Sequence, residues 1–438
     1  MSFKTDLLSA IETRTATIGI VGMGYVGLPL AVEFAEAGFS VIALDVNADK
    51  VATLNQGVSY IEDITSEQVA HLVNAGKLRA TTSYDDLRAV DAISICVPTP
   101  LRKTKDPDMS FIIQSVESIA TIAHEGMLVI LESTTYPGTT EEIVRPRIEK
   151  NGLVVGESLF IAFSPERIDP GNKTYGVRNT PKVVGGITAN CTEIAAALYG
   201  TGVDRVVKVS SPTSAEMVKL LENTFRAVNI GLVNEMALMC DKLGIDVWEV
   251  INAAATKPFG FMPFYPGPGL GGHCIPVDPH YLSWKLKTLN YNARFIELAS
   301  EINTAMPVYV VDKVVDALND QSLSVRGSRV VVLGVAYKPD VTDVRESPAL
   351  DIIELLRQKG ADVVYHDPFV PSIRLVDDKQ TMSTQVYSDD LLASANCVVI
   401  VTNHTSYDWE HVLAHSPVIV DTRNAVSGYD TNTPVITL

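Results

Sequence analysis

No stretch of this 438-residue chain stays apolar for the roughly 18 positions that a membrane-spanning helix requires. The opening residues, MSFKTDLLSAIETRT, lack the basic segment and apolar core of a secretory signal. We therefore expect a cytoplasmic protein. Apolar residues at 46% and charged residues at 20% are typical of a globular protein, and the length predicts two or three domains.

Cysteine is scarce, and no CxxC pair occurs. The five residues lie far apart in the sequence, at Cys96, Cys191, Cys240, Cys274 and Cys397. An odd number of widely spaced cysteines fits neither a disulfide framework nor a structural zinc site, so we expect five thiols.

Positive charge is also in short supply, with 35 Lys and Arg against 52 Asp and Glu and a formal net charge of -17. Such a surface repels polyanions, so nucleic acid and acidic membranes are poor partners. A small anionic ligand can still bind where a few Lys and Arg side chains converge.

The first 200 residues or so alternate short apolar strands with helical stretches. TIGIVGM (17–23) predicts a buried strand, GYVGLPLAVEFAEAG a helix that ends at Gly38, and FSVIALDVN a second strand. Further apolar strands are predicted at 91–98, 127–134 and 158–165. This pattern predicts a doubly wound α/β domain with a parallel sheet.

A single long helix is predicted from Pro212 to Leu243, with proline in its first turn and Gly244 just past its end. At about 1.5 Å per residue it spans about 48 Å, which is typical of a helix that bridges domains or packs against a partner subunit. From about residue 327, GSRVVVLGVAYKP, SPALDIIELLRQKG and ADVVYHDP predict another βαβ unit, followed by strands at 395–402 and 417–423.

We therefore expect an α/β protein with two Rossmann-like doubly wound domains joined by a central helical domain. The predicted boundaries are 1–205 for the first α/β domain, 206–305 for the central domain and 306–438 for the second α/β domain.

Gly22, Gly24 and Gly27 form a GxGxxG pattern directly after a strand and at the start of a helix. The first glycine permits a tight turn, the second lets a pyrophosphate approach the backbone, and the third allows close packing of helix and strand. Asp45 ends the next strand, where a carboxylate can bind ribose hydroxyls and repel a 2′-phosphate. The pattern favours NAD as cofactor, the alternative being a glycine turn that serves packing alone.

The stretch before Cys274, TKPFGFMPFYPGPGLGG (256–272), holds four prolines, five glycines and four aromatics, which predicts a shaped loop. Cys274 has this glycine-built approach, with His273 beside it and Asp278 four places on. A buried structural thiol is the alternative, since free cysteines commonly behave as small hydrophobes.

The other cysteines fit that alternative better. Cys96 and Cys397 fall in apolar strands, and Cys240 falls in an apolar part of the long helix. Cys191 heads a helix, where a thiolate is stabilised, but the carboxylate of Glu193 opposes this effect.

Lys219 and Asn223 lie one turn apart on the long helix, with Glu216 a turn before and Arg226 a turn after. A solvated polar stripe is one interpretation. The other is a site in which an ammonium and a carboxamide hold a developing oxyanion.

HVLAH places His411 and His415 at the helical spacing of metal ligands. The HExxH glutamate is missing and no third ligand stands nearby in the sequence. We expect a surface helix and no bound metal.

Taken together, these features resemble the UDP-glucose/GDP-mannose dehydrogenase family, from about residue 15 to 425. Five stretches look most like the bacterial UDP-N-acetylglucosamine 6-dehydrogenases of surface-polysaccharide pathways: LESTTYPGTTEE (131–142), SPERIDPGN (164–172), KLLENTFRAVNIGLVNE (219–235), KPFGFMPFYPGPGLGGHCIPVDP (257–279) and YKPDVTDVRESP (337–348). The resemblance implies oxidation of a sugar CH2OH to a carboxylate with two NAD+, through a cysteine adduct. It also implies a UDP-N-acetylhexosamine substrate and a homodimer or larger homo-oligomer built on the long helix.

Roles carry over by matching position. The resemblance implies that the following residues act in catalysis: Cys274 as nucleophile, Lys219 and Asn223 at the oxyanions, Asp278 at the hydrolytic water, and Thr134 and Glu166 in proton transfer through water. It implies that the cofactor is bound by Gly22, Gly24, Tyr25, Val26, Gly27, Asp45, Lys50, Thr99 and Arg345. It implies that the substrate is bound by Arg167, Lys257, Phe259, Phe264, Tyr265, Gly271 and Lys338.

Two positions depart from the UDP-glucose dehydrogenases, which carry a glutamate at Pro170 and a lysine at Val277. Both departures indicate a different sugar pocket, consistent with an N-acetyl group, and they leave Glu166 without a second carboxylate. The configuration at C2 stays open, so UDP-N-acetylmannosamine, UDP-N-acetylgalactosamine and UDP-glucose are alternative substrates. A two-electron hydroxyacid dehydrogenase and a non-catalytic protein that binds NAD or a nucleotide sugar are the competing functions.

Overall fold

The computed structural model describes residues 2–61, 63–102, 106–150, 152–169, 171–172, 174–272, 274–375 and 380–438. The chain folds into two compact units, Met1–Glu222 with His280–Tyr291, and Asn223–Pro279 with Asn292–Leu438. Among the described helices, none combines the length and the hydropathy that a bilayer span requires. The three domain boundaries drawn from the sequence remain a prediction.

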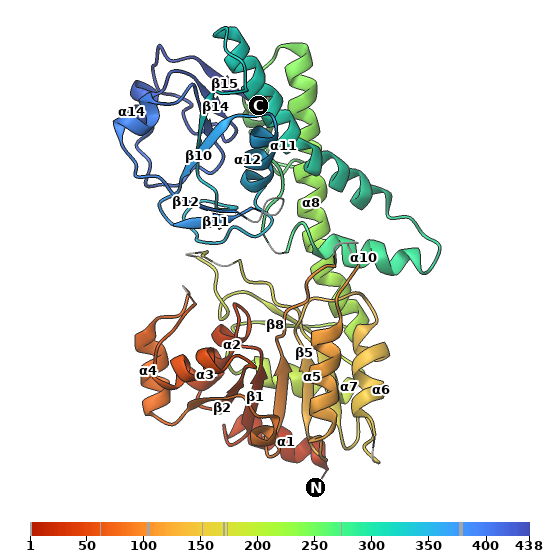
Figure 1. Ribbon diagram of the computed structural model, residues 1–438. Coiled ribbons are helices and arrows are strands. Elements are labelled where there is room, and N and C mark those ends of the chain that lie inside the picture. The colour runs from red at the N-terminus through yellow and green to blue at the C-terminus, as the bar shows by residue number, and fades with distance from the viewer. Residues whose placement is uncertain are drawn as a thin grey trace. The chain divides into compact units, whose positions relative to one another are not determined.

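The first unit is built on an eight-stranded sheet in the order β3-β2-β1-β4-β5-β6-β7-β8, parallel throughout except between β6 and β7 (Figure 1). Its strands are β1 (Thr17–Val21), β2 (Ser40–Leu44), β3 (Leu78–Thr81), β4 (Ala92–Ile95), β5 (Leu128–Leu131), β6 (Phe160–Phe163), β7 (Lys182–Gly186) and β8 (Val206–Lys208). Its helices are α1 (Phe3–Glu12), α2 (Gly27–Glu36), α3 (Ala48–Asn55), α4 (Ser66–Asn74), η1 (Tyr84–Leu87), α5 (Ser110–Ala120), η2 (Thr140–Val144), α6 (Arg145–Ile148) and α7 (Ala189–Tyr199).

The strand order reverses between β1 and β4. Right-handed crossovers on either side of this reversal place α2 on one face of the sheet and α5 on the other. Strands covered on both faces are nearly continuous apolar runs, and β4, β5 and β6 are fully buried, with Ser94 of β4 as their one polar residue. The doubly wound fold predicted from the sequence is confirmed. In such folds a ligand binds outside the carboxyl ends of the strands on either side of the reversal, which here are β1 and β4.

The long helix predicted from the sequence is confirmed as α8 (Pro212–Leu243), with 32 residues (Figure 1). Its residues up to Glu222 belong to the first unit and those from Asn223 onward to the second. α10 (Asp278–Lys287) likewise begins in the second unit and continues in the first.

The second unit contains a five-stranded parallel sheet in the order β10-β9-β13-β14-β15. Its strands are β9 (Arg329–Leu333), β10 (Asp362–His366), β13 (Cys397–Ile400), β14 (Ile419–Asp421) and β15 (Val435–Thr437), with a separate hairpin of β11 (Ser372–Arg374) and β12 (Thr381–Ser383). Its helices are α9 (Val247–Ala255), α11 (Arg294–Asp320), α12 (Pro348–Gln358), α13 (Asp389–Ala393) and α14 (Trp409–His415).

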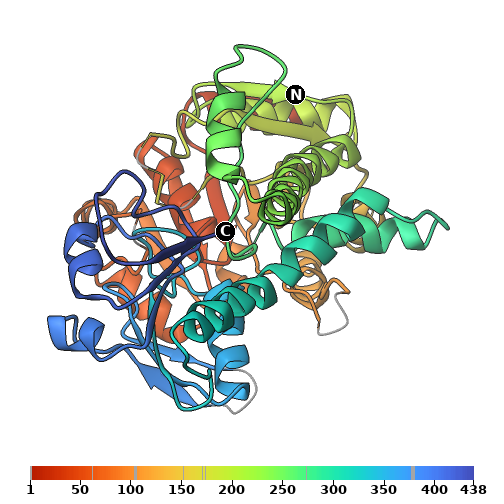
Figure 2. The same cartoon turned by 90° about the horizontal axis from the view of Figure 1, so that it is seen from above.

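Alternate side chains of β9 enter two different cores of this unit. Val330 and Val332 pack with apolar residues of α11 and α12 on one face of the sheet. Val331 and Leu333 pack with residues of α13 and α14 on the other face. Figures 1 and 2 both show α14 across the sheet from α11. The second α/β fold predicted from the sequence is thus confirmed.

Candidate active site

The glycine loop after β1 is shaped by two close backbone contacts. A Cβ at Gly22, whose φ is +95°, would lie 2.6 Å from the carbonyl oxygen of Cys96, and a Cβ at Gly27 would lie 1.8 Å from that of Gly22. Around Gly24 the space is open, since no heavy atom of the described residues other than its chain neighbours lies within 4 Å of a Cβ built there. This opening lets a pyrophosphate reach the backbone.

The N-terminus of α2 adjoins this loop. Its N-cap residue Val26 makes no side-chain hydrogen bond to the helix in the described structure. The N–H of Leu28 already donates to the carbonyl oxygen of Gly24 at 3.2 Å and Pro29 has no N–H, which leaves the N–H of Gly27 in this first turn to a ligand. N–H groups at a helix N-terminus bind phosphate, aided by the helix dipole. The residues present therefore fit the pyrophosphate of a dinucleotide.

Asp45 is buried at the carboxyl end of β2, beside the glycine loop. Its carboxylate accepts hydrogen bonds from the backbone N–H of Met23 and of Asn47, both at 2.9 Å. The ammonium of Lys50 lies 3.8 Å from the same carboxylate and 5.4 Å from the ring centroid of Tyr60. These contacts hold a carboxylate where the ribose of a dinucleotide is bound in this fold.

Thr99 lies in the loop that follows β4, on the other side of the reversal point. Its carbonyl oxygen accepts a 2.6 Å hydrogen bond from the hydroxyl of Tyr281 on α10. Thr134 follows β5 in the chain and is partly buried. Their predicted roles at the cofactor and in proton transfer remain predictions.

A buried charge cluster lies beyond the carboxyl ends of β5 and β6. The ammonium of Lys182 lies 2.7 Å from the carboxylate of Glu132 and 3.2 Å from that of Glu166. The hydroxyl of Tyr199 donates a short hydrogen bond to the other oxygen of Glu132. The second oxygen of Glu166 accepts from the backbone N–H of Ile168 at 2.8 Å.

Burial and neighbouring charge compete at these carboxyls. Burial acts to raise the pKa of Glu166, but the Lys182 ammonium, the backbone N–H groups and Lys219 outweigh it and leave the pKa below its usual value. At Glu132 burial prevails over Lys182, and the pKa is raised. Burial disfavours the ammonium of Lys182, but the two carboxylates reverse this effect and raise its pKa.

Glu166 was predicted from the family resemblance, whereas Lys182, Glu132 and Tyr199 were not predicted. Glu132 is separated from Lys182 by 50 positions and from Tyr199 by 67. The sequence offered two signals for this cluster. One is a carboxyl directly after a buried strand, and the other is a lysine at the start of another strand.

The polar residues near the start of α8 are buried in the first unit. Lys219 is 8% exposed, and its positive charge contributes to the lowered pKa of Glu166. The carboxylate of Glu216 accepts from the backbone N–H of Thr140 at 2.9 Å and from its hydroxyl at 2.7 Å. The interpretation of these residues as a solvated polar stripe is therefore wrong for Glu216 and Lys219. Arg226 is exposed to solvent, as that interpretation requires.

Arg167 is held by protein groups of the first unit. Its guanidinium forms a two-point ion pair with Glu222 of α8, at 2.6 and 3.2 Å, and donates to the carbonyl oxygen of Pro181 at 2.6 Å. Its predicted substrate role stays a prediction.

Cys274 differs from the other four cysteines because its side chain is partly exposed while theirs are buried. Burial, aided by the nearby Glu132 charge, raises the pKa of the Cys96 thiol well above its usual value, and burial raises that of Cys397 to about 12. The thiol of Cys191 accepts a hydrogen bond from the Thr188 hydroxyl. The alternative of a sealed structural thiol therefore does not hold for Cys274.

Asn223 and Asp278 come together beside the cysteine turn of the second unit. The amide nitrogen of Asn223 donates to the carboxylate of Asp278 at 2.5 Å, and the Asp278 side chain is buried. The backbone N–H groups of Asp278 and Val277 donate to the carbonyl oxygen of Cys274 at 2.8 and 3.0 Å. His273 and Pro170, which the sequence analysis considered, lie outside the described residues.

The glycines before Cys274 pack against the YKPD and VRES stretches. A Cβ at Gly271 would lie 2.7 Å from the Cβ of Tyr337, and one at Gly272 would lie 2.9 Å from the Tyr337 ring. The N–H of Gly272 donates to the carbonyl oxygen of Arg345 at 2.9 Å. The ammonium of Lys338 lies 5.6 Å from the Tyr337 ring centroid. These stretches therefore support the cysteine loop, as well as carrying the predicted ligand contacts Lys338 and Arg345.

The guanidinium of Arg345 is exposed and pairs with Asp343 at 2.7 Å. The aromatic residues of the 256–272 loop contact two helices. Phe264 packs edge to face on Phe225 of α8, and Tyr265 stacks on Trp248 of α9 with 13° between the rings. The other predicted substrate contacts of the loop, both exposed, are Lys257 and Phe259. Contact of these residues with a uridine stays a prediction.

Comparison with known proteins matches this architecture along most of the chain. Three models of the UDP-glucose/GDP-mannose dehydrogenase family match: its NAD binding domain at 16–203, its central domain at 213–305 and its UDP binding domain at 331–428. A UDP-N-acetyl-D-glucosamine 6-dehydrogenase of Pseudomonas aeruginosa is 39% identical over 355 residues, which cover 81% of this chain and 83% of the relative.

A UDP-N-acetyl-D-mannosamine dehydrogenase of Pyrococcus horikoshii is 34% identical over 416 residues, which cover 93% of this chain and 96% of the relative. The solved structure of a UDP-D-ManNAc dehydrogenase from Pyrococcus horikoshii superposes with a TM-score of 0.88 at 33% identity, over 96% of this chain and 98% of that one. The chain thus belongs to the UDP-glucose/GDP-mannose dehydrogenase family and is an NAD-dependent nucleotide-sugar dehydrogenase.

Proposed function

We propose that this chain is a cytoplasmic enzyme that oxidises C6 of UDP-N-acetylglucosamine to the uronate for surface-polysaccharide synthesis. Relatives named for UDP-N-acetylglucosamine and for UDP-N-acetylmannosamine support an N-acetylhexosamine, and the mannosamine sugar is the second candidate substrate. The observation that carries the proposal is the partly exposed Cys274. The same turn contains Asp278, whose carboxylate accepts a hydrogen bond from Asn223 of α8.

The reaction removes four electrons, and NAD+ accepts a hydride in each of its two oxidations. The alcohol loses a hydride from C6 and a proton from oxygen, which leaves an aldehyde. An aldehyde cannot lose a second hydride until a nucleophile makes C6 tetrahedral again. Cys274 supplies this step, because its sulfur bonds to C6 and the aldehyde oxygen takes up the thiol proton. The resulting thiohemiacetal also keeps the intermediate bound.

The second oxidation removes a hydride and a proton from the thiohemiacetal and gives a thioester on Cys274. Water then forms a bond to C6, the C–S bond breaks, and the thiol and the carboxylate are released. The carboxylate of Asp278 is held by Asn223 and orders this water.

Asn223 and Lys219 stabilise negative charge on the C6 oxygen. A carboxamide carries two N–H donors, so Asn223 can bind Asp278 with one and an oxyanion with the other. Lys219 adds an ammonium one helical turn away. Each contact is stronger in a water-excluded site than at the surface.

Glu166 serves as the proton acceptor of the first unit, acting through water with Thr134. Its lowered pKa keeps it ionised near neutral pH, as a carboxylate that accepts a proton must be. Lys182 and the backbone N–H groups that lower this pKa also fix the carboxylate in place.

We further propose three domains, 1–205, 206–305 and 306–438, and a homodimer built on α8. Phe225, Leu232 and Met239 are exposed apolar residues seven positions apart on this helix, so they form one stripe. Light scattering after size-exclusion chromatography tests the dimer, and a monomer at micromolar concentration would contradict it.

NADH formation with UDP-GlcNAc, UDP-ManNAc, UDP-GalNAc and UDP-glucose, measured side by side, tests the substrate assignment. We expect the highest kcat/KM with UDP-GlcNAc. A higher value with UDP-ManNAc would select the second candidate, and no turnover of any UDP-sugar would reject a UDP-sugar dehydrogenase.

A further inference from the structure

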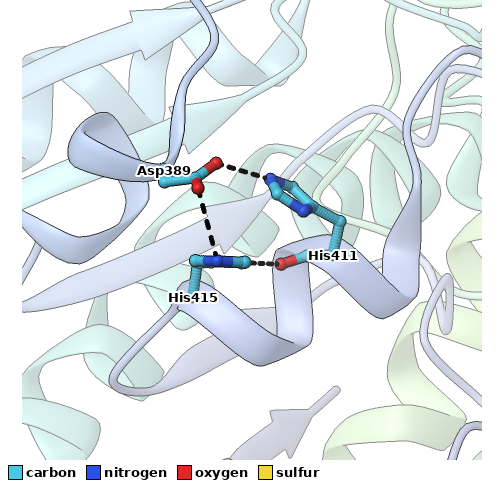
Figure 3. Close-up of side chains that lie close together, drawn as sticks. All are labelled: Asp389, His411 and His415. Carbon is cyan, nitrogen blue, oxygen red and sulfur yellow. Dashed lines mark hydrogen bonds and ion pairs between the residues drawn. The ribbon is translucent and has the colours of Figure 1, made fainter.

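Asp389, His411 and His415 form a side-chain cluster on two helices of the second unit (Figure 3). The His411 Nε2 atom lies 3.0 Å from one carboxylate oxygen of Asp389, and the His415 Nε2 atom lies 3.6 Å from the other. Within the described residues this is the group in which three potential metal ligands meet, with all ligand atoms within 4.8 Å of one another.

The two helices hold these side chains in place through a shared apolar core. Leu391 and Leu392 of α13 pack in the same buried cluster as Val412 and Leu413 of α14. Asp389 stands at the first residue of α13, and both histidines lie one turn apart on α14. The three side chains therefore face one another from two helices that are packed directly together.

A backbone contact of His415 fixes which of its two ring nitrogens carries the lone pair when the ring is neutral. The Nδ1 atom lies 2.9 Å from the carbonyl oxygen of His411, and a carbonyl only accepts, so Nδ1 carries a proton. The lone pair of the neutral ring is then on Nε2, which faces Asp389 (Figure 3). A lone pair and a carboxylate repel each other unless a cation lies between them. That cation is either a second proton on the ring or a metal ion.

We propose that Asp389, His411 and His415 bind Zn²⁺ or a similar divalent transition metal ion. Imidazole and carboxylate are ordinary ligands of such ions. Two ligands of a tetrahedral Zn²⁺, each about 2.0–2.1 Å from the metal, lie about 3.3 Å apart. The His411 Nε2 atom lies 3.0 Å from one oxygen of Asp389 and the His415 Nε2 atom lies 3.6 Å from the other, on either side of this value, so each imidazole has a carboxylate oxygen near the separation of two bound ligands.

The outer contact of His415 fits the same role. A metal-bound imidazole commonly donates its other N–H to a carbonyl or carboxylate, which fixes its orientation. The His411 carbonyl provides this contact. The metal would join α13 to α14 across their exposed ends and stabilise the second unit against unfolding. The HVLAH spacing alone did not reveal the site, because Asp389 precedes His411 by 22 positions.

Metal binding to the full-length protein tests the proposal. Zn²⁺ affinity and stoichiometry are measured by competition with a metallochromic indicator on the wild type, His411→Ala, His415→Ala and Asp389→Asn. The matched control is His71→Ala, which removes an exposed imidazole from α4. We expect loss of one bound equivalent, or at least about a tenfold weaker affinity, in each cluster variant and no change in the control. Circular dichroism verifies that every variant is folded.

Two further measurements identify the ligands and the effect. Co²⁺ bound at this site should give d–d absorption without a sulfur-to-cobalt charge-transfer band, whereas binding at Cys274 would add that band. Zn²⁺ should raise the thermal midpoint of the wild type and of His71→Ala but not of His411→Ala. Equal Zn²⁺ affinity in wild type and cluster variants would overturn the proposal. So would the absence of Zn²⁺ binding by the wild type near neutral pH.

Discussion

Replacing Lys182 by methionine removes the ammonium that lies between Glu132 and Glu166, while it nearly keeps the length of the side chain. The ammonium is 2.7 Å from one carboxylate and 3.2 Å from the other, and all three side chains are buried. Removing one partner of a buried ionic cluster leaves uncompensated charge, which typically costs about 3–5 kcal/mol. We expect Lys182→Met to destabilise the first unit by about that amount at pH 7.

The expected loss of unfolding free energy follows from the cost of protonating one of the two carboxyls in the variant. At an effective dielectric constant of about 20, each contact contributes about 5–6 kcal/mol of gross attraction, most of which offsets the cost of burying the charges. Protonation of Glu132 lets the variant avoid part of this loss of stability, because burial already raises the pKa of Glu132. Protonation at pH 7 of a group with an ordinary pKa of 4.5 costs about 3.4 kcal/mol. For a unit of this size, such a loss lowers the thermal midpoint by about 7–14 °C.

The pH dependence of the unfolding free energy follows from the directions in which the pKa values of Glu132 and Glu166 are shifted. Burial raises the folded pKa of Glu132 above its unfolded value even with Lys182 in place, and loss of Lys182, which lowers this pKa, raises it further. In the variant the contribution of Glu132 to stability is therefore present below pH 4.5 and is lost as the pH rises. In the wild type the lowered pKa of Glu166 contributes stability near neutral pH that is lost on acidification. The difference between the two proteins should therefore shrink to about 1 kcal/mol at pH 5.

Urea unfolding of both proteins at pH 7 and pH 5, followed by circular dichroism and fluorescence, measures this difference. Lys285→Met is the control, because Lys285 pairs with Glu142 at 2.6 Å but at the surface of the same unit, where such a pair is worth less than about 1 kcal/mol. A difference below about 1 kcal/mol at pH 7, or one that grows on acidification, would show that Lys182 does not stabilise the two buried carboxylates in this way.

Three further predictions concern the cofactor and the thiol. Cys274→Ser should bind NAD+ and UDP-sugar normally but lower uronate formation by more than about a thousandfold, and sustained uronate production would contradict the thioester route. Asp45→Ala should raise KM for NAD+ by about 10- to 150-fold, since a charged hydrogen bond is lost, with KM for the sugar unchanged; unchanged NAD+ affinity would mean that the ribose is held elsewhere. Gly24→Ala should fold like the wild type, because its Cβ enters open space, yet lose NAD+ affinity measured by calorimetry; tight binding would show that the pyrophosphate does not approach there.

Much of the first unit could be predicted from the sequence because its determinants are local. The glycine pattern adjoins both the strand that it follows and the helix that it opens. Pro212 and Gly244 mark the ends of α8, and the predicted bounds agree with those of the structure. The predicted strands were each longer than the observed ones, because flanking apolar residues such as Val97 extend the pattern beyond the paired segment.

The contacts between segments could not be predicted in the same way. Lys182 meets Glu132 and Glu166 only because β5, β6 and β7 are neighbours in the sheet, and that order is not encoded in any single segment. Asn223 and Asp278 are 55 positions apart. The family resemblance named both residues but not the hydrogen bond between them.

In the proposed reaction one sulfur atom, that of Cys274, captures a sugar aldehyde so that oxidation occurs twice. The most direct measurement is the amount of NADH formed when a limiting amount of UDP-GlcNAc is consumed completely in excess NAD+. We predict two NADH for each UDP-sugar, together with one uronate. One NADH for each UDP-sugar, with a stable aldehyde as product, would contradict capture of the aldehyde by Cys274.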